Sequence, residues 1–170
     1  NFFRDTFPYS LPPLAHFEPT PVPLARPENI WITDTTFRDG QQSRAPYAVD
    51  QIVRLFELLA RLGGPKGMIR QTEFFLYTRK DREAVERCQE LALPFPEITG
   101  WIRATMADYA LVRAAGLRET GILCSISDYH IFKKLGSTRE RVLAGYLEVI
   151  DAALADGVLP RVHIEDSTRA

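Results

Sequence analysis

Hydrophobic and polar positions along the chain predict strands and helices in alternation from residue 30 onward. Residues 48–62 place apolar side chains at helical spacing, and Gly63 with Gly64 ends that pattern. Short apolar runs of strand length separate this helix from later ones. The predicted strands cover residues 30–34, 68–75, 97–105, 120–127 and 161–166, and the predicted helices cover residues 48–62, 79–92, 105–116 and 137–157.

Local signals mark where several of these helices begin. Thr105 with Asp108 opens one helix, and Thr78 opens another. The residues S-T-R-E that start at Ser137 form a capping-box pattern, so we expect the following helix to begin there. Strands that alternate with helices through short connections imply a parallel sheet with right-handed crossovers.

A barrel and an open doubly wound sheet share this alternation. No glycine-rich phosphate-binding motif follows any predicted strand, which removes the main support for a nucleotide-binding open sheet. Polar residues gather instead where strands end, which is where barrel enzymes place their chemistry. These residues are Asp34 to Asp39, Glu73, Ser125, Ser127, Glu165 and Asp166. We therefore predict a TIM (β/α)8 barrel.

The predicted barrel is incomplete in this sequence of 170 residues. A full barrel needs eight strands and about 250 residues. The chain supplies about five strands and four helices, which would leave its fifth strand with an unpaired edge. We expect residues 30–170 to be the N-terminal portion of a larger catalytic domain, or another element to complete the sheet.

Residues 1–29 form a separate region, rich in proline and aromatic side chains. Proline at this density excludes regular helix and interior strand. The aromatic residues favour an extended arm that packs on a surface, either of its own domain or of a partner subunit. A mostly disordered tail is the alternative.

Composition limits the binding partners and the compartment that we expect for this protein. A formal net charge of -1 gives no electrostatic reason to bind nucleic acid, and no apolar run is long enough for a membrane span. No signal-peptide pattern opens the chain. Cys88 and Cys124 lack metal or redox spacing and fit buried thiols in a reducing compartment, so we expect a cytoplasmic protein.

The segment TFRDGQQS holds the most distinctive chemistry. Arg38 cannot lose its proton and is suited to stabilise a carbonyl or enolate oxygen. Asp39 offers oxygen ligands for a divalent cation, and Gly40 lets the backbone turn closely. A surface salt bridge in a strand-to-helix loop is the simpler alternative for this segment.

Five segments together resemble the DRE-TIM metallolyase superfamily. They are DTTFRDGQQ, TEFF, WIRATMADYALVRAAGL, SISDYHIF and HIEDSTRA, in the order in which the superfamily has them. That superfamily contains 2-isopropylmalate, homocitrate and citramalate synthases and 3-hydroxy-3-methylglutaryl-CoA lyase. The resemblance covers residues 30–170 and implies a metal-dependent TIM barrel.

The resemblance also implies roles for single residues. Arg38 matches the arginine that polarises the keto oxygen, and Asp39 the aspartate that binds the divalent metal. Gln42 matches a nearby polar contact to substrate, and Glu73 the glutamate that orients substrate or metal-bound water. Glu165 matches the acidic residue that lines the substrate pocket and is counted with Arg38 as catalytic.

Strand parity supports part of this assignment. Along residues 161–166, Val162 and Ile164 share one face, which we expect to pack outward on helices. His163 and Glu165 then point into the barrel, where His163 is either a substrate contact or a hydrogen-bonded core histidine.

Three further residues have open assignments. His130 lies in the loop after the fourth strand, as a substrate contact or as a capping or structural residue. Thr105 stands where homocitrate synthases have histidine, which weakens that substrate assignment and leaves Thr105 as a candidate substrate contact. Arg169 matches an arginine with a structural role.

Departures from the superfamily's pattern limit the prediction. An H-x-H pair completes the superfamily's metal site, whereas the histidines here are His16, His130 and His163. The metal site is therefore incomplete in these residues. The bulky FFLY after Glu73 also replaces the small residues common in the synthases, which changes the expected pocket shape.

The expected activity is an acetyl-CoA-dependent synthase of the 2-isopropylmalate or homocitrate type. A divalent metal (Mg²⁺, Mn²⁺ or Zn²⁺) and Arg38 would hold a 2-oxo acid while the acetyl-CoA enolate attacks it, in a homo-oligomer assembled through the arm or the missing C-terminal region. The alternatives are cleavage in the lyase direction and a non-catalytic half-barrel module. Biotin-dependent carboxyltransferases also resemble DTTFRD but continue with Ala-His where this chain has Gly40-Gln41.

Overall fold

A computed structural model describes residues 16–17, 20–21 and 27–170, which belong to two compact units, residues 1–30 and 31–170. In the first unit, β1 (His16–Phe17) and β2 (Thr20–Pro21) form a short antiparallel pair. Most of the arm predicted over residues 1–29 lies outside the described residues, so that interpretation stays a prediction.

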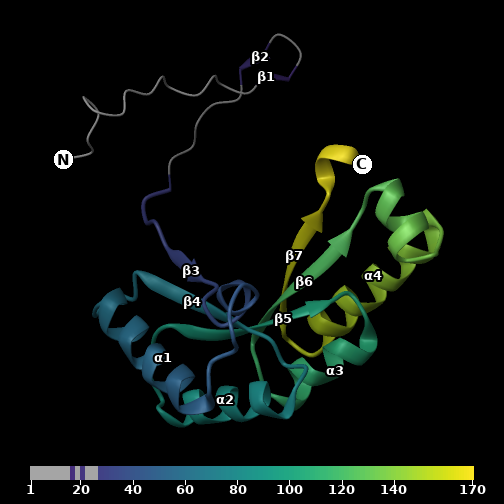
Figure 1. Cartoon of the computed structure of the whole chain (residues 1–170). Helices are drawn as coiled ribbons and strands as arrows, with labels where there is room; N and C mark the ends of the chain where they lie inside the picture. The colour runs from purple at the N-terminus through teal and green to yellow at the C-terminus, as the bar shows by residue number, and fades with distance from the viewer. Residues whose placement is uncertain (1–15, 18–19, 22–26) are drawn as a thin grey trace. The chain divides into compact units, whose positions relative to one another are not determined.

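The second unit is a curved sheet of five parallel strands in the order β3-β4-β5-β6-β7, so each strand pairs with the next one along the chain. The strands are β3 (Ile32–Asp34), β4 (Ile69–Phe74), β5 (Glu97–Arg103), β6 (Glu119–Ser125) and β7 (Leu159–Glu165). The helices α1 to α4 all lie on the convex side of this sheet (Figure 1). This is the predicted partial barrel, with five strands and four α-helices.

The helix bounds agree with the sequence pattern to within a few residues. They are α1 (Val49–Gly63), α2 (Arg79–Glu90), α3 (Met106–Ala114) and α4 (Arg139–Ala155). The predicted caps Thr78 and Thr105 are confirmed, but α4 is capped by Thr138 rather than Ser137, because the Thr138 hydroxyl accepts from the Arg141 amide. None of the described helices is long and apolar enough to cross a membrane.

The core lies between the sheet and the helices. Phe74 on β4 packs against Phe37 with ring centroids 4.8 Å apart and against Phe56 of α1. Cys88 and Cys124 are buried free thiols, as the sequence indicated. Burial raises the pKa of the Cys88 thiol to about 12 and that of Cys124 to about 11, so neither thiol is a ready nucleophile.

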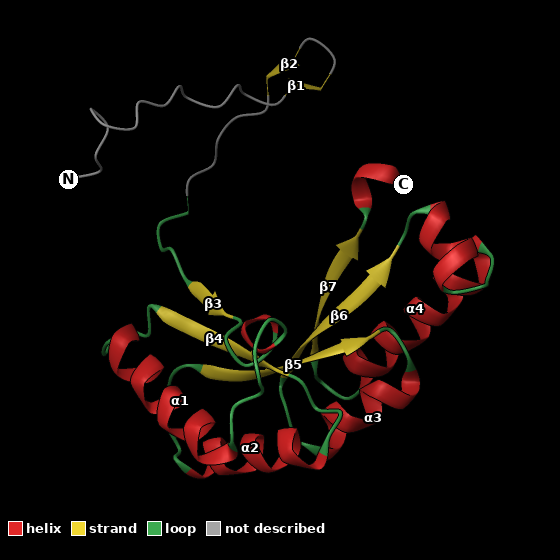
Figure 2. Ribbon diagram, viewed as in Figure 1, coloured by secondary structure: helices red, strands yellow, loops and turns green. Residues whose placement is uncertain are grey.

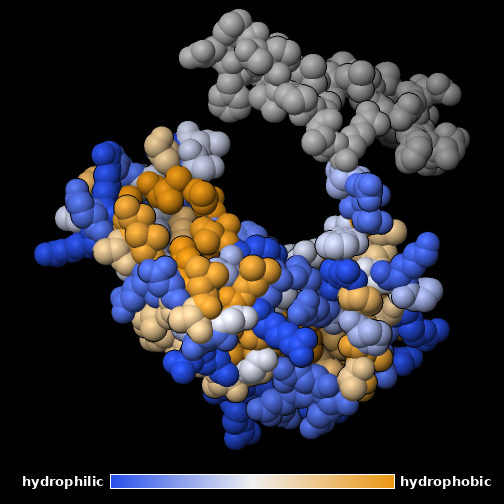
Figure 3. All heavy atoms as spheres, turned by 180° about the vertical axis from the view of Figure 1, so that it is seen from behind, coloured by the Kyte–Doolittle hydropathy of each residue, from blue (hydrophilic) through white to orange (hydrophobic). Residues whose placement is uncertain are grey.

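The outer face of β7 differs from the expectation. Val162 and Ile164 do point away from His163, but they are 42% and 56% exposed, because the described helices leave this part of the face uncovered. Together with exposed leucines of α4 they form a group of exposed apolar side chains. Hydrophobic residues gather over this part of the molecule in Figure 3. The other members, all on α4, are Leu143, Leu147 and Leu154.

Short helical turns follow several strands at the carboxyl edge of the sheet. After β3 comes the 3-10 turn η1 (Asp39–Gln41), and after β6 the π-helix η2 (His130–Lys134). The 3-10 turn η3 (Ser167–Arg169) follows β7. Figure 2 shows β6 and β7 side by side, both leading to this edge.

Candidate active site

The loop after β3 is organised by Asp34. One carboxylate oxygen accepts hydrogen bonds from the Thr36 amide (3.1 Å) and the Thr72 hydroxyl (3.0 Å), and the other accepts from the Thr36 hydroxyl (2.9 Å). An aspartate that binds the backbone two residues later is a typical turn former. Asp34 therefore shapes the loop that presents Arg38 and Asp39.

Three side chains hold Arg38, the residue that precedes η1. Its Nε donates to Glu73 Oε2 (2.6 Å) and its Nη1 to Asp39 Oδ1 (2.9 Å). Its guanidinium carbon also lies 3.7 Å from the ring centroid of Trp101, a cation–π distance. Because the side chain is only 14% exposed, the Arg38 charge is held in place before any substrate arrives.

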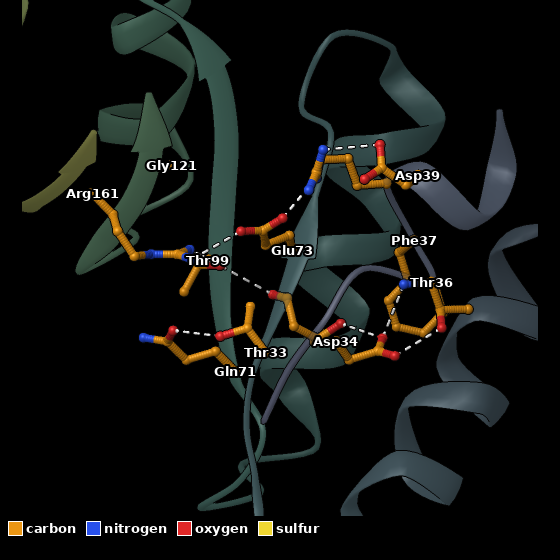
Figure 4. Close-up of polar contacts among 12 residues, drawn as sticks. Thr33, Asp34, Thr36, Phe37, Asp39, Gln71, Glu73, Thr99, Gly121 and Arg161 are labelled. Atoms are coloured by element: carbon orange, nitrogen blue, oxygen red, sulfur yellow. Dashed lines mark hydrogen bonds and ion pairs between the residues drawn. The ribbon is translucent and has the colours of Figure 1, made fainter. Parts of the chain in front are cut away.

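Glu73 lies between two arginines, Arg38 and Arg161, and Figure 4 shows it facing Arg161. Its side chain is 1% exposed, Oε2 accepts from Arg38, and Oε1 pairs with Arg161 Nη1 at 3.0 Å. Arg161 on β7 also donates to Glu119 Oε1 (2.7 Å) and approaches the Thr99 hydroxyl (3.4 Å). A buried carboxylate needs such compensation, because burial without partners would be costly.

Trp101 and Gly121 fit together on the inner face of the sheet. A Cβ on Gly121 would lie 2.4 Å from the Trp101 ring, so the ring occupies the space that a side chain on β6 would fill. His163 packs edge-on against Trp101 with centroids 4.5 Å apart. His163 thus points inward as predicted, and burial, followed by the nearby Arg161 charge, lowers its pKa and favours the neutral ring.

Glu165, at the end of β7, is held by side chains from β6 and η2. Its Oε2 accepts from the Lys134 ammonium (2.6 Å) and from the Ser125 hydroxyl, and His130 Nδ1 lies 3.3 Å away. The hydrogen bond from Lys134, then that from Ser125, lowers the pKa of Glu165. Glu165 is therefore a carboxylate that stays ionised at neutral pH.

Asp166 and Arg169 stabilise the turn that follows. Asp166 has φ 63°, a left-handed conformation that aspartate tolerates better than most residues. Its carboxylate accepts from Arg169 Nε (2.8 Å) and from the Ser127 hydroxyl (2.5 Å). The Arg169 contact, then the Ser127 contact, lowers the pKa of Asp166 to about 2. The predicted structural role of Arg169 agrees with this ion pair.

Two predicted substrate contacts lie apart from these clusters. Gln42 is exposed, whereas its neighbour Gln41 ties the loop by donating to the Phe37 carbonyl (2.7 Å) and accepting from the Tyr47 amide (2.9 Å). The Thr105 hydroxyl caps α3 by accepting from the Asp108 amide (3.2 Å). Substrate contact by Gln42 and Thr105 stays a prediction.

The described residues fit the implied divalent metal only in part. Asp39 has a suitable hard-oxygen carboxylate that is 48% exposed beside Arg38. Within residues 27–170, no three His, Cys, Asp or Glu side chains come together as a ligand set. Asp39 is therefore a candidate for one ligand.

The structure adds residues that sequence reasoning did not single out. Arg161 has the same strand parity as His163 and Glu165, so the alternation along β7 already pointed to it. For Trp101 and Lys134 the sequence carried no comparable signal, because their roles depend on packing across strands and on the π-helical turn.

Comparison with known proteins identifies the family of this chain. The family profile described as HMGL-like matches residues 29–170. The chain belongs to the HMGL-like family. It is 55% identical over 170 residues to the citrate (Re)-synthase of Syntrophus aciditrophicus, covering 100% of this chain and 27% of that protein. The citrate (Re)-synthase of Clostridium kluyveri is 53% identical over the same 170 residues, covering 100% of this chain and 38% of that protein.

A solved structure has a similar fold. Hydroxymethylglutaryl-CoA lyase from Pseudomonas aeruginosa aligns with a TM-score of 0.63 at 17% identity, over 81% of this chain and 46% of the lyase. The resemblance to the DRE-TIM metallolyase superfamily is thereby confirmed, as is the partial barrel. The chain spans between about a quarter and two fifths of the length of both citrate (Re)-synthases.

Proposed function

We propose that this chain is part of the catalytic domain of a synthase that condenses acetyl-CoA with oxaloacetate to give citrate. The observation that carries the proposal is the identity of more than half the residues, over the whole chain, to two citrate (Re)-synthases. The 2-isopropylmalate and homocitrate chemistry expected from the sequence is the same reaction with a different 2-oxo acid.

The identity of the 2-oxo acid follows from the product. Removing the two carbons that acetyl-CoA contributes to citrate leaves a four-carbon 2-oxo diacid, oxaloacetate. The methyl carbon of acetyl-CoA loses a proton and bonds to the keto carbon, and water then cleaves the thioester. Acetyl-CoA, oxaloacetate and water thus give citrate, coenzyme A and a proton.

Arg38 would act on the keto oxygen, where negative charge develops as the carbon–carbon bond forms. A guanidinium that cannot lose its proton stabilises that charge without taking part in proton transfer. Glu73 and Trp101 hold the group in place, so little reorganisation is needed during the reaction. Donors of this kind contribute roughly 100- to 1,000-fold in rate.

Asp39 and Glu165 would supply the remaining groups at this edge of the sheet. A divalent metal, held in part by Asp39, would polarise the carbonyl of the 2-oxo acid when bound. Glu165 is ionised and its side chain is 31% exposed, so its carboxylate can accept a proton from substrate or water.

Release of the coenzyme A thiol by the intact enzyme tests this proposal. We expect thiol release from acetyl-CoA to need oxaloacetate and a divalent metal, and the product to be citrate. Arg38→Gln should lower kcat by roughly 100-fold or more. Arg44→Gln is the matched control, because Arg44 lies on the same loop but contacts only Tyr47 and its own turn among the described residues.

Two results would reject the proposal. One is thiol release that depends on a different 2-oxo acid while oxaloacetate is inert. The other is no release with any 2-oxo acid, together with cleavage of 3-hydroxy-3-methylglutaryl-CoA, which would favour the lyase alternative.

A further inference from the structure

The π-helix η2 brings two side chains to one oxygen of Glu165. Lys134 Nζ lies 2.6 Å and His130 Nδ1 3.3 Å from Oε2. The wide turn is closed by the Leu135 amide, which donates to the His130 carbonyl five residues back (2.9 Å). Single π-helical turns within helical segments are rare, and those that occur are often at functional sites.

Hydrogen bonds anchor η2 to the residues that follow β6 and β7. The His130 amide donates to the Ser127 hydroxyl (3.2 Å), and that hydroxyl in turn donates to Asp166 (2.5 Å). The start of η2 is therefore tied to the end of β7, the strand that carries Glu165. Within the described residues, His130 Nδ1 is buried and makes no hydrogen bond, although it faces the Glu165 carboxylate.

We propose that Lys134 is a positioning residue that fixes the Glu165 carboxylate for the condensation reaction. The inference rests on the proposed function for its meaning in catalysis, but the contact itself does not. Glu165 is 31% exposed and at the end of a strand, so without a partner its side chain would sample several rotamers. Lys134 and Ser125 both engage Oε2, which sets the direction in which the carboxylate points.

The charge around Glu165 comes mainly from Lys134. Several elements contribute polar or titratable groups near the carboxylate. They are Lys134 and His130 from η2, Ser125 from β6, Tyr146 from α4, and Asp166 beside it in the chain. Asp166 is already neutralised by Arg169, so the ammonium of Lys134 is the group whose removal changes the local charge most.

Substitution of Lys134 in the intact enzyme tests the proposal. Lys134→Met keeps the aliphatic stem and removes the charge, and Lys133→Met makes the same change at an exposed residue of the same turn. We expect Lys134→Met to lower kcat roughly 10- to 100-fold with a smaller change in KM, since a hydrogen bond to a charged group is lost. Lys134→Arg should recover part of the rate, and Lys133→Met should stay within about twofold of the unaltered enzyme.

A titration separates positioning from a general loss of structure. Carbon-13 NMR of labelled glutamate carboxyls, assigned with Glu165→Gln, follows ionisation of Glu165 without any need for turnover. Because Lys134 lowers the pKa of Glu165, its removal should shift the titration midpoint to higher pH. Lys133→Met should leave the midpoint unchanged.

The outcomes distinguish this inference from the proposed function. An equal midpoint in both methionine variants overturns the inference. So does equal turnover by both variants with whichever 2-oxo acid the enzyme uses. If oxaloacetate is inert but another 2-oxo acid reacts and Lys134→Met slows it, the proposed substrate is wrong and the role of Lys134 stands. If no 2-oxo acid reacts, the proposed function fails, and the midpoint decides only whether Lys134 acts on the Glu165 carboxylate.

Discussion

The ion pair between Glu73 and Arg161 should be a measurable determinant of stability. The Oε1 to Nη1 distance is 3.0 Å, and the two side chains are 1% and 28% exposed. Two unit charges at that distance attract by roughly 5 kcal/mol at an effective dielectric constant near 20. Desolvation of the charges and the partial exposure of Arg161 reduce this attraction. The second partner reduces it further, because Arg38 still neutralises Glu73 when Arg161 is removed. We expect a net coupling free energy of about 2 kcal/mol.

A double-mutant cycle measures this coupling. The variants are Glu73→Gln, Arg161→Met and the double variant, each made in the intact enzyme. Hydrogen exchange at the amides of β4 and β7 reports the local free energy of opening, so the whole protein need not unfold in one step. We expect the double variant to lose about 2 kcal/mol less than the sum of the two single variants.

A surface pair supplies the control for this cycle. Arg54 and Glu57 on α1 are 3.2 Å apart but 64% and 40% exposed, so their coupling should stay below about 0.5 kcal/mol. If the Glu73–Arg161 coupling is as small as that of the control, the buried pair does not stabilise the inner face. Arg161 would then not be the group that compensates the buried charge of Glu73.

Two further predictions concern the metal and the packing of the sheet. Asp39→Asn should weaken Mn²⁺ binding by roughly tenfold or more in a calorimetric titration. Asp151→Asn, at an exposed position of α4, should leave the affinity unchanged. Equal affinities of the two variants would remove Asp39 from the ligand set. Gly121→Ala should destabilise the sheet by about 1–3 kcal/mol in a denaturant titration, because its methyl group would meet the Trp101 ring. Gly145→Ala on α4, where a methyl group meets nothing within 4 Å, should be neutral or stabilising, and equal effects at both glycines would contradict the packing argument.

Much of the fold was predictable because local pattern and topology agree. The apolar periodicity of α1 and the threonine caps at Thr78 and Thr105 define helices before any tertiary contact is known. Short connections then leave parallel pairing as the simple solution. The sequence pattern predicts the cap of α4 one residue too early, because Ser137 and Thr138 offer equivalent hydroxyls and only the backbone geometry decides between them.

The site was predictable where it depends on strand parity and not where it depends on packing. The alternation of side chains along β7 predicts that His163 and Glu165 point inward, and it predicts the same for Arg161. The cation–π contact between Arg38 and Trp101 joins residues far apart in sequence, and it requires the glycine opposite the ring. Lys134 reaches Glu165 through a π-helical turn, and π-helix has no sequence pattern comparable to helical periodicity.

Two of the inward carboxylates, Glu73 and Glu165, are held in ways that favour different roles. Both oxygens of Glu73 are occupied by arginines and the side chain is almost fully buried, so a substrate would have to displace a buried ion pair to reach it. This favours Glu73 as the residue that orients Arg38 over Glu73 as a direct substrate contact. Glu165 is held at one oxygen and lies partly exposed at the edge of the sheet, where a proton can be exchanged. Substitution of Glu73 should therefore reduce stability and the effect of Arg38 together, whereas substitution of Glu165 should affect turnover far more than stability.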